Sequence, residues 1–233
     1  MEKRKDNYVA FMDLMGFADF VRGESHGRVG EYLSALAGFA EALNVAGLGI
    51  GMRIFSDSVV LNLPDDGKPD TYHKFLLYVC NLQLAALTAP GLGTLPLRGS
   101  VTKGAYAADG GKLTYGRAPV DAYEMENRMA VYPRILVSPE DYKPENVRAL
   151  NLNEKAITVR RDFDGLLHLN YLSAVYGTSG KWIPQGNQYA GAHKELIQRN
   201  IEKHKGDKRV LAKYEWMKNY HNWFCGGIED LAI

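Results

Sequence analysis

Cysteine is scarce in this chain of 233 residues, which holds only Cys80 and Cys225. Two cysteines cannot form the disulfide framework of a small secreted protein, and no Cys-x-x-Cys spacing suits a structural zinc. The charged first residues, 1–6, are followed by too few apolar ones for a signal peptide. The sequence therefore predicts a reduced, cytoplasmic setting.

Long apolar runs and an excess of one charge are also missing. No run approaches the ~18 apolar residues of a membrane-spanning helix, so we expect a soluble protein without a membrane partner. Lys and Arg number 28 against 27 Asp and Glu. Because nucleic-acid binding usually needs a basic face, we expect no nucleic-acid partner. The chain also lacks a Walker-type glycine loop and a Gly-x-Ser-x-Gly elbow.

An apolar strand that runs into an acidic residue is the most informative feature present. Residues 8–14 form this strand, with Asp13 near its end. Such an apolar strand is typical of the centre of a sheet, whose carboxyl end is where ligands of open α/β sheets bind. A second acidic residue, Asp57, lies between two short β-branched runs that indicate a hairpin.

If these strands are neighbours, the two carboxylates converge, as a divalent ion that bridges nucleotide phosphates requires. Each aspartate alone also has a structural explanation. Asp13 can cap the following helix, and Asp57 can be an ordinary turn residue.

The order of the remaining elements predicts an α+β fold. An amphipathic helix (29–43), a second helix (72–87), a long strand (96–107), a tight turn into residues 112–115, a helix and a strand follow in turn. This is a βαββαβ-like (ferredoxin-like) core, with a mixed or antiparallel sheet and helices on one face.

The second half of the chain is less regular. We expect a helix to start at Ser138, strands at 157–160 and 166–171, and helices at 193–205 and 207–224. His193, His204 and His221 are too scattered for a zinc site and are interpreted as packing or surface residues. The expected organisation is a catalytic domain, 1–186, and a C-terminal helical extension packed on it, 187–233.

Several motifs in order resemble the class III nucleotide cyclase family. They are the Asp13-Leu-Met-Gly-Phe17 turn, the hairpin with Asp57, the Arg-containing strand 97–104, the Gly116–Glu126 helix and the strand 132–138. The matches cover residues 7–140. More narrowly, the short Asp-Leu-x-Gly-Phe form, the Ala-Tyr-x-x-Glu helix and the Tyr-Pro-Arg-Ile strand resemble the bacterial pyrimidine cyclases of the Pycsar anti-phage systems.

The resemblance implies a metal site. Asp13 and Asp57 would hold two Mn²⁺ or Mg²⁺ ions, with the carbonyl of Leu14 as a backbone ligand. Gly16 and Phe17 would form the turn whose backbone N–H groups meet the triphosphate of the substrate.

Charged residues near this site have expected roles as well. Arg53 stands four residues before Asp57, where purine cyclases of the family place a base-selecting Lys. Arg98 is expected to take part in catalysis, and Lys103 to bind substrate. The family's transition-state Asn and Arg are replaced by Val120 and Glu124.

The implied reaction converts a pyrimidine nucleoside triphosphate, with UTP favoured, to 3′,5′-cyclic UMP and pyrophosphate. The product would be a second messenger in anti-phage defence, so the effector would be reached only through the cyclic nucleotide. The resemblance also implies a homodimer with its sites at the interface. The alternatives are a purine cyclase and an inactive cyclase-like module that binds nucleotide or dimerises.

Overall fold

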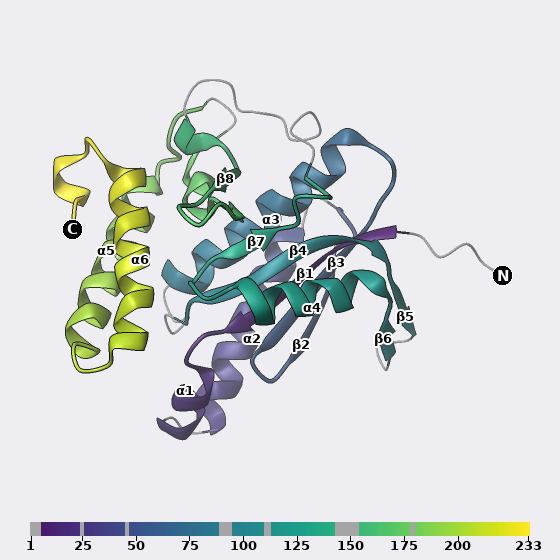
Figure 1. Ribbon diagram of the computed structural model, residues 1–233, viewed down its shortest axis with the longest axis horizontal. Helices are drawn as coiled ribbons and strands as arrows, with labels where there is room; N and C mark the ends of the chain where they lie inside the picture. Colours follow the sequence, from purple (N-terminus) through teal and green to yellow (C-terminus); the bar gives the residue numbers. More distant parts are fainter. Residues whose placement is uncertain are drawn as a thin grey trace.

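The structure is a computed structural model that describes residues 6–23, 26–44, 47–88, 95–109, 113–142, 154–177 and 180–233. Its centre is a seven-stranded sheet in the order β2-β3-β1-β4-β7-β9-β8 (Figure 1). The strands are β1 (Asp6–Leu14), β2 (Gly51–Phe55), β3 (Ser58–Pro64), β4 (Leu97–Ala105), β7 (Ile135–Val137), β8 (Val159–Arg161) and β9 (Leu167–Leu169). Strands β4 and β7 are parallel and the other pairs are antiparallel, so the sheet is mixed, as the sequence predicted.

The first strand lies inside the sheet, between β3 and β4, because its residues are apolar on both faces. Tyr8, Ala10 and Met12 are buried in the main core, whereas Val9 belongs to a smaller cluster that Phe11 packs against. Successive side chains of a strand point to opposite faces, so these two sets face different layers. Asp13 follows Phe11 on the second face.

The helices cover both faces of the sheet, which corrects the expectation that they lie on one. The helices are α1 (Phe17–Gly23), α2 (His26–Leu43), α3 (Pro69–Thr88), α4 (Arg117–Met129), α5 (Gly186–Lys203) and α6 (Lys208–Cys225). Helix α3 packs on the main-core face. Helix α4 crosses the opposite face, here called the α4 face (Figure 1).

Helix α4 sits close to the sheet because its inward residues are small. Ala118 and Ala122 are buried, four residues apart on one side of the helix. Their carbonyls accept hydrogen bonds from two hydroxyls of β4, at 2.8 Å from Thr102 and 2.7 Å from Ser100. These bonds fix the position of α4 over the end of β1.

The C-terminal helices share the main core. Helix α5 packs on α3, and Leu196, Ile197, Met217 and Phe224 belong to the cluster that holds the residues of β1. The division at residues 186 and 187 stays a prediction. None of the helices within the described residues is long and apolar enough to cross a membrane.

Smaller elements complete the described chain. They are the ribbon β5 (Ala107–Asp109) and β6 (Leu113–Tyr115), with the 3₁₀ turns η3 (Glu154–Ala156), η4 (Tyr171–Val175) and η5 (Glu229–Leu231). The helix start expected at Ser138 is wrong as far as residue 142, because residues 139–141 form a turn. Residues 143–153 lie outside the described part. The strands expected at 157–160 and 166–171 are present as the shorter β8 and β9, and the second ends early because η4 begins at Tyr171.

Candidate active site

The two predicted aspartates meet where β1 ends. Asp13 pairs in register with Ser58, the first residue of β3, and the backbone N–H of Leu14 donates to the carbonyl of Asp57 at 2.8 Å. Asp57 occupies the two-residue loop between β2 and β3, as predicted. The hairpin therefore holds the Asp57 carboxylate beside that of Asp13.

The pKa of Asp13 reflects its burial and the proximity of Asp57. Burial raises the pKa of its carboxyl, and the neighbouring Asp57 raises it further, while Arg98 acts in the opposite direction. Two carboxylates in such proximity disfavour ionisation of both unless a cation lies between them.

Arg98 is on the α4 face directly across from Asp13, in the register of β1 with β4. Its Nε lies 3.1 Å from Oδ2 of Asp13 and 2.9 Å from Oε1 of Glu126. Its Nη1 donates to the carbonyl of Ala130 at 3.4 Å. The guanidinium thus joins the end of β1 to the end of α4.

Glu126 is a site residue to which the sequence analysis gave no role. It follows Ala118 and Ala122 at four-residue steps, so it lies on the buried side of α4. Its side chain is 5% exposed, and burial raises its pKa, with Asp13 and Asp57 adding to the rise. Although Oε1 is ion-paired with Arg98, it accepts no hydrogen bond of good geometry from the described residues. The same four-residue spacing was a usable signal in the sequence.

The donor set suits a hard divalent ion. Two carboxylates plus oxygens of the substrate are the usual ligands of Mg²⁺, which is seldom held by protein groups alone. No group of three or more His, Cys, Asp or Glu residues in the described chain has an arrangement that could hold a metal ion without substrate. Leu14 is at the end of β1, beside both aspartates, where its carbonyl is the predicted backbone ligand.

The turn after β1 has the predicted shape. Gly16 has φ of 82°, a conformation that favours glycine, and its carbonyl accepts from the N–H of Phe20 at 3.0 Å as α1 begins. The Phe17 side chain is buried in the main core. That contact anchors the turn, and the binding of triphosphate by its N–H groups stays a prediction.

Arg53 lies on the α4 face, two strands away from Asp13. Its Nη1 donates to the hydroxyl of Tyr106 at 2.6 Å. Tyr106 is buried under α4 in the same cluster as Val9. The guanidinium is therefore held at a fixed place beside the hairpin.

Lys103 does not reach this site, which corrects its expected role in substrate binding. It is five residues along β4 from Arg98, and an odd separation on a strand puts the two side chains on opposite faces. Its Nζ is 2.6 Å from Oδ2 of Asp65, and it lies over the ring of Tyr8. Lys103 therefore forms its contacts near the start of β1, opposite the end that carries Asp13.

Val120 and Glu124 point away from the site of their own chain. Val120 is 54% exposed and Glu124 is also exposed, on the side of α4 opposite Ala118 and Ala122. Their side chains can therefore contact another molecule only if it binds to the outer side of α4.

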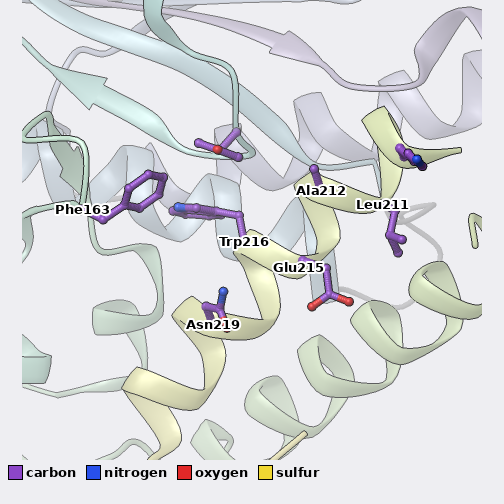
Figure 2. A pocket seen from close by; sticks show the side chains of 8 residues that line it. Phe163, Leu211, Ala212, Glu215, Trp216 and Asn219 are labelled. Carbon is purple, nitrogen blue, oxygen red and sulfur yellow. The ribbon is translucent and has the colours of Figure 1, made fainter.

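A pocket opens beside α6 (Figure 2). Phe163 and Trp216 lie next to each other on one side of it, and Glu215 and Asn219 extend from α6 (Figure 2). The lining residues are Tyr132, Phe163, Lys208, Leu211, Ala212, Glu215, Trp216 and Asn219. None of them is a residue predicted to act in catalysis.

Comparison with known proteins gives likeness in structure only. No protein-family model matches the chain, and no curated protein matches it. The monomeric guanylyl cyclase domain of the RhoGC fusion protein from the aquatic fungus Blastocladiella emersonii is 15% identical. It matches over 71% of this chain and 94% of its own, with a TM-score of 0.53.

Two further structures agree. The guanylate cyclase domain of RhGC from Catenaria anguillulae, in complex with GTP, is 13% identical over 72% of this chain and 96% of its own, with a TM-score of 0.53. The catalytic core of a rhodopsin-guanylyl cyclase with converted specificity, in complex with ATPαS, is 15% identical. It matches over 64% of this chain and 86% of its own, with a TM-score of 0.50. These likenesses confirm the class III cyclase fold that the motifs predicted.

Proposed function

We propose that the chain is a nucleotidyl cyclase that converts a nucleoside triphosphate to a 3′,5′-cyclic nucleotide and pyrophosphate. The observation that carries the proposal is the convergence of Asp13 and Asp57 at the end of β1 in this fold, with Arg98 and Glu126 beside them. A module that only dimerises has no need of two half-buried carboxylates side by side, where burial and the neighbouring Asp57 raise the pKa of Asp13.

In this reaction the ribose 3′-oxygen bonds to the α-phosphorus while the bond from that phosphorus to the pyrophosphate oxygen breaks. Bound Mn²⁺ or Mg²⁺ would lower the pKa of the 3′-hydroxyl and neutralise phosphate charge. Asp13, Asp57 and the Leu14 carbonyl would hold these ions. Arg98 orients the Asp13 carboxylate through its Nε, and the turn at Gly16 and Phe17 offers N–H groups to the phosphates.

The base is a finer proposal, and we favour a pyrimidine. The motifs that resemble Pycsar pyrimidine cyclases support it, as does Arg53, whose guanidinium has only donors and suits the O2 and O4 acceptors of uracil. UTP is therefore the proposed substrate and cyclic UMP the product, a messenger in anti-phage defence that reaches its effector by diffusion. The second candidate is a purine cyclase, because one similar structure is named as a complex with GTP and another as one with ATPαS.

We also propose a homodimer whose sites lie at the interface. Large apolar side chains are exposed around α4 and the nearby strand ends, and these are Phe55, Tyr115, Val120 and Tyr123. Phe55 belongs to the same face as Arg53 by strand alternation, so it lies on the α4 side of the sheet. Exposed apolar groups gathered on one side of a domain favour burial against another protein surface.

The test is to incubate the purified chain with each of the four nucleoside triphosphates and Mn²⁺, and to separate the products by chromatography. The proposal expects cyclic nucleotide and pyrophosphate in equal amounts, with UTP the best substrate. Asp70→Asn, an exposed substitution at the start of α3, is the matched control for changes at Asp13 and Asp57. Absence of cyclic product from all four triphosphates would contradict the proposal, and cyclic GMP or cyclic AMP as the main product would select the purine candidate.

A further inference from the structure

Helix α6 carries a half-buried lysine, Lys213. Trp216 follows it by three residues and so shares its side of the helix. Trp216 stacks on Tyr132, with ring centroids 5.9 Å apart and planes at 16°, and its indole N–H donates to Asp162 at 2.8 Å. This contact fixes which side of α6 turns toward the sheet.

Trp216 packs on the segment 130–134, which follows α4 and begins at the candidate site. Tyr132 comes two residues after Ala130, whose carbonyl accepts from Arg98. Arg134, fully buried behind Tyr132, pairs with Asp162 and Asp164 and holds this segment in place. Figure 1 shows α6 next to α5, on the side of the molecule toward which β1 runs. One short segment thus joins the ring on which Trp216 stacks to the carbonyl that Arg98 contacts, which brings the side of α6 that carries Lys213 toward the Asp13–Arg98 pair.

The charges that change the pKa of Lys213 show which charged residues lie around it. Burial lowers the pKa of its ammonium, followed by the positive charges of Arg98 and Arg209, while Asp13 and Asp207 oppose them. Within the described residues, no carboxylate lies within ion-pair distance of Lys213 or Arg209, and the Arg98 guanidinium is already committed to Asp13 and Glu126.

A half-buried ammonium without an ion-pair partner of its own is costly, and a bound anion removes this cost. A triphosphate held at Asp13 and Asp57 through metal ions places several negative oxygens at this end of the sheet. An ammonium, with three donors on a flexible stem, suits such oxygens.

We propose that Lys213 binds the β- or γ-phosphate of the nucleoside triphosphate, so that the C-terminal helix α6 completes the substrate site of its own chain. This inference rests on the proposed cyclase function for the identity of the nucleotide. The triphosphate group itself is the ligand that Lys213 recognises.

Direct binding of inorganic triphosphate with Mn²⁺, measured by calorimetry, tests the inference without turnover. Lys213→Gln and Lys213→Met remove the charge, and Lys213→Arg retains it. Lys208→Gln is the matched control, since Lys208 is an exposed lysine of the same helix, five residues away and thus about 140° around the helix axis. A 3′-deoxynucleoside triphosphate, which cannot cyclise, and the corresponding monophosphate are measured beside it.

We expect Lys213→Gln and Lys213→Met to weaken triphosphate binding by about ten- to a hundredfold, the range for a charge-assisted hydrogen bond. Lys213→Arg should restore affinity to within about threefold, and Lys208→Gln and the monophosphate should be unaffected. Triphosphate affinity equal to that of the unchanged chain would overturn the inference. So would an equal loss for the monophosphate, or a large loss of thermal stability in both charge-removing variants, because either outcome makes the lysine structural. If the unchanged chain forms no cyclic product, the cyclase proposal fails, while the inorganic triphosphate result still decides the role of Lys213.

Discussion

Arg98 and Asp13 face each other across adjacent strands, with Nε of Arg98 3.1 Å from Oδ2 of Asp13. The pair is half-buried, and its arginine also contacts the nearly buried Glu126. One carboxylate oxygen of Asp13 is thereby fixed toward β4. The other side of the carboxyl group remains next to Asp57, which is the geometry that a bridging cation needs.

Replacement of Asp57 by Asn tests this geometry. The change removes one anionic ligand and almost no volume, so we expect the fold to persist and turnover to fall on the order of a thousandfold. Asp13→Asn should behave alike, and the double variant should be no worse than either single variant, because the two carboxylates act as one unit. The rate of cyclic nucleotide formation measures this, with Asp70→Asn as control. A rate for Asp57→Asn within tenfold of the unchanged chain would contradict the two-carboxylate site.

The parts of the site that local sequence pattern predicted are those set by strand and hairpin geometry. The strand ending in Asp13, the hairpin with Asp57 and the turn at Gly16 each follow from a few consecutive residues. The error at Lys103 was avoidable, since the period of two along a strand already separates it from Arg98. Glu126 was similarly accessible from its spacing to Ala122.

The contribution of the C-terminal helices was not predictable in this way. The proposed role of Lys213 depends on the contact of Trp216 with Tyr132, two residues far apart in the chain. Likewise, His193 and His221 were interpreted as separate packing or surface residues. The structure buries both and hydrogen-bonds them to each other across α5 and α6. Such pairings depend on how helices pack, which residue spacing within one helix does not record.

The buried histidine pair predicts how stability changes with pH. The two Nδ1 atoms are 2.9 Å apart, Tyr171 Oη is 2.8 Å from Nε2 of His193, and Nε2 of His221 is 2.8 Å from the Leu231 carbonyl. Since a carbonyl only accepts, His221 carries its proton on Nε2, His193 donates from Nδ1, and Tyr171 donates to His193. All three bonds form with both rings neutral.

Burial lowers the pKa of both histidines below the ordinary 6.5, so the unfolded chain takes up protons there before the folded chain does. Stability is therefore full above about pH 6.5 and is lost as pH falls below it, by up to about 1.4 kcal/mol per pH unit for each ring. Urea unfolding at pH 7.5 and 5.5 measures this loss. A His193→Gln, His221→Gln double variant should show a smaller loss, with His204→Gln as the matched control. An equal loss in the double variant and the unchanged chain would refute the assignment.

The exposed apolar residues on α4 predict the assembly state. A charge at Val120 or Tyr123 should prevent their burial against a second copy, so Val120→Asp and Tyr123→Asp should shift the chain from dimer to monomer and lower activity at least tenfold. Sedimentation velocity across a range of concentrations measures the assembly. Phe163→Asp is the control, because Phe163 is also largely exposed (74%) but lies in the turn between β8 and β9. A chain that is monomeric and fully active at all concentrations would disprove the interface.

The choice of base is the last prediction, and it depends on Arg53. Its Nη1 donates to the Tyr106 hydroxyl, which leaves the remaining N–H groups of the fork for a ligand. Uracil offers acceptors at O2 and O4, whereas cytosine has a donor amine at position 4. A donor-only fork at that edge should favour uracil by about ten- to a hundredfold in kcat/KM, the range for one hydrogen bond made or left unpaired.

Arg53→Ala should therefore reduce the preference for UTP over CTP, measured as the ratio of kcat/KM values. Tyr106→Phe should reduce it partly, because the guanidinium loses its fixed partner while its charge stays. Tyr123→Phe, which removes the hydroxyl of a half-exposed tyrosine on α4, is the matched control. If Arg53 binds phosphate instead, Arg53→Ala slows UTP and CTP equally and the ratio survives. That result, or cyclic CMP as the main product, would exclude Arg53 as the residue that recognises the base.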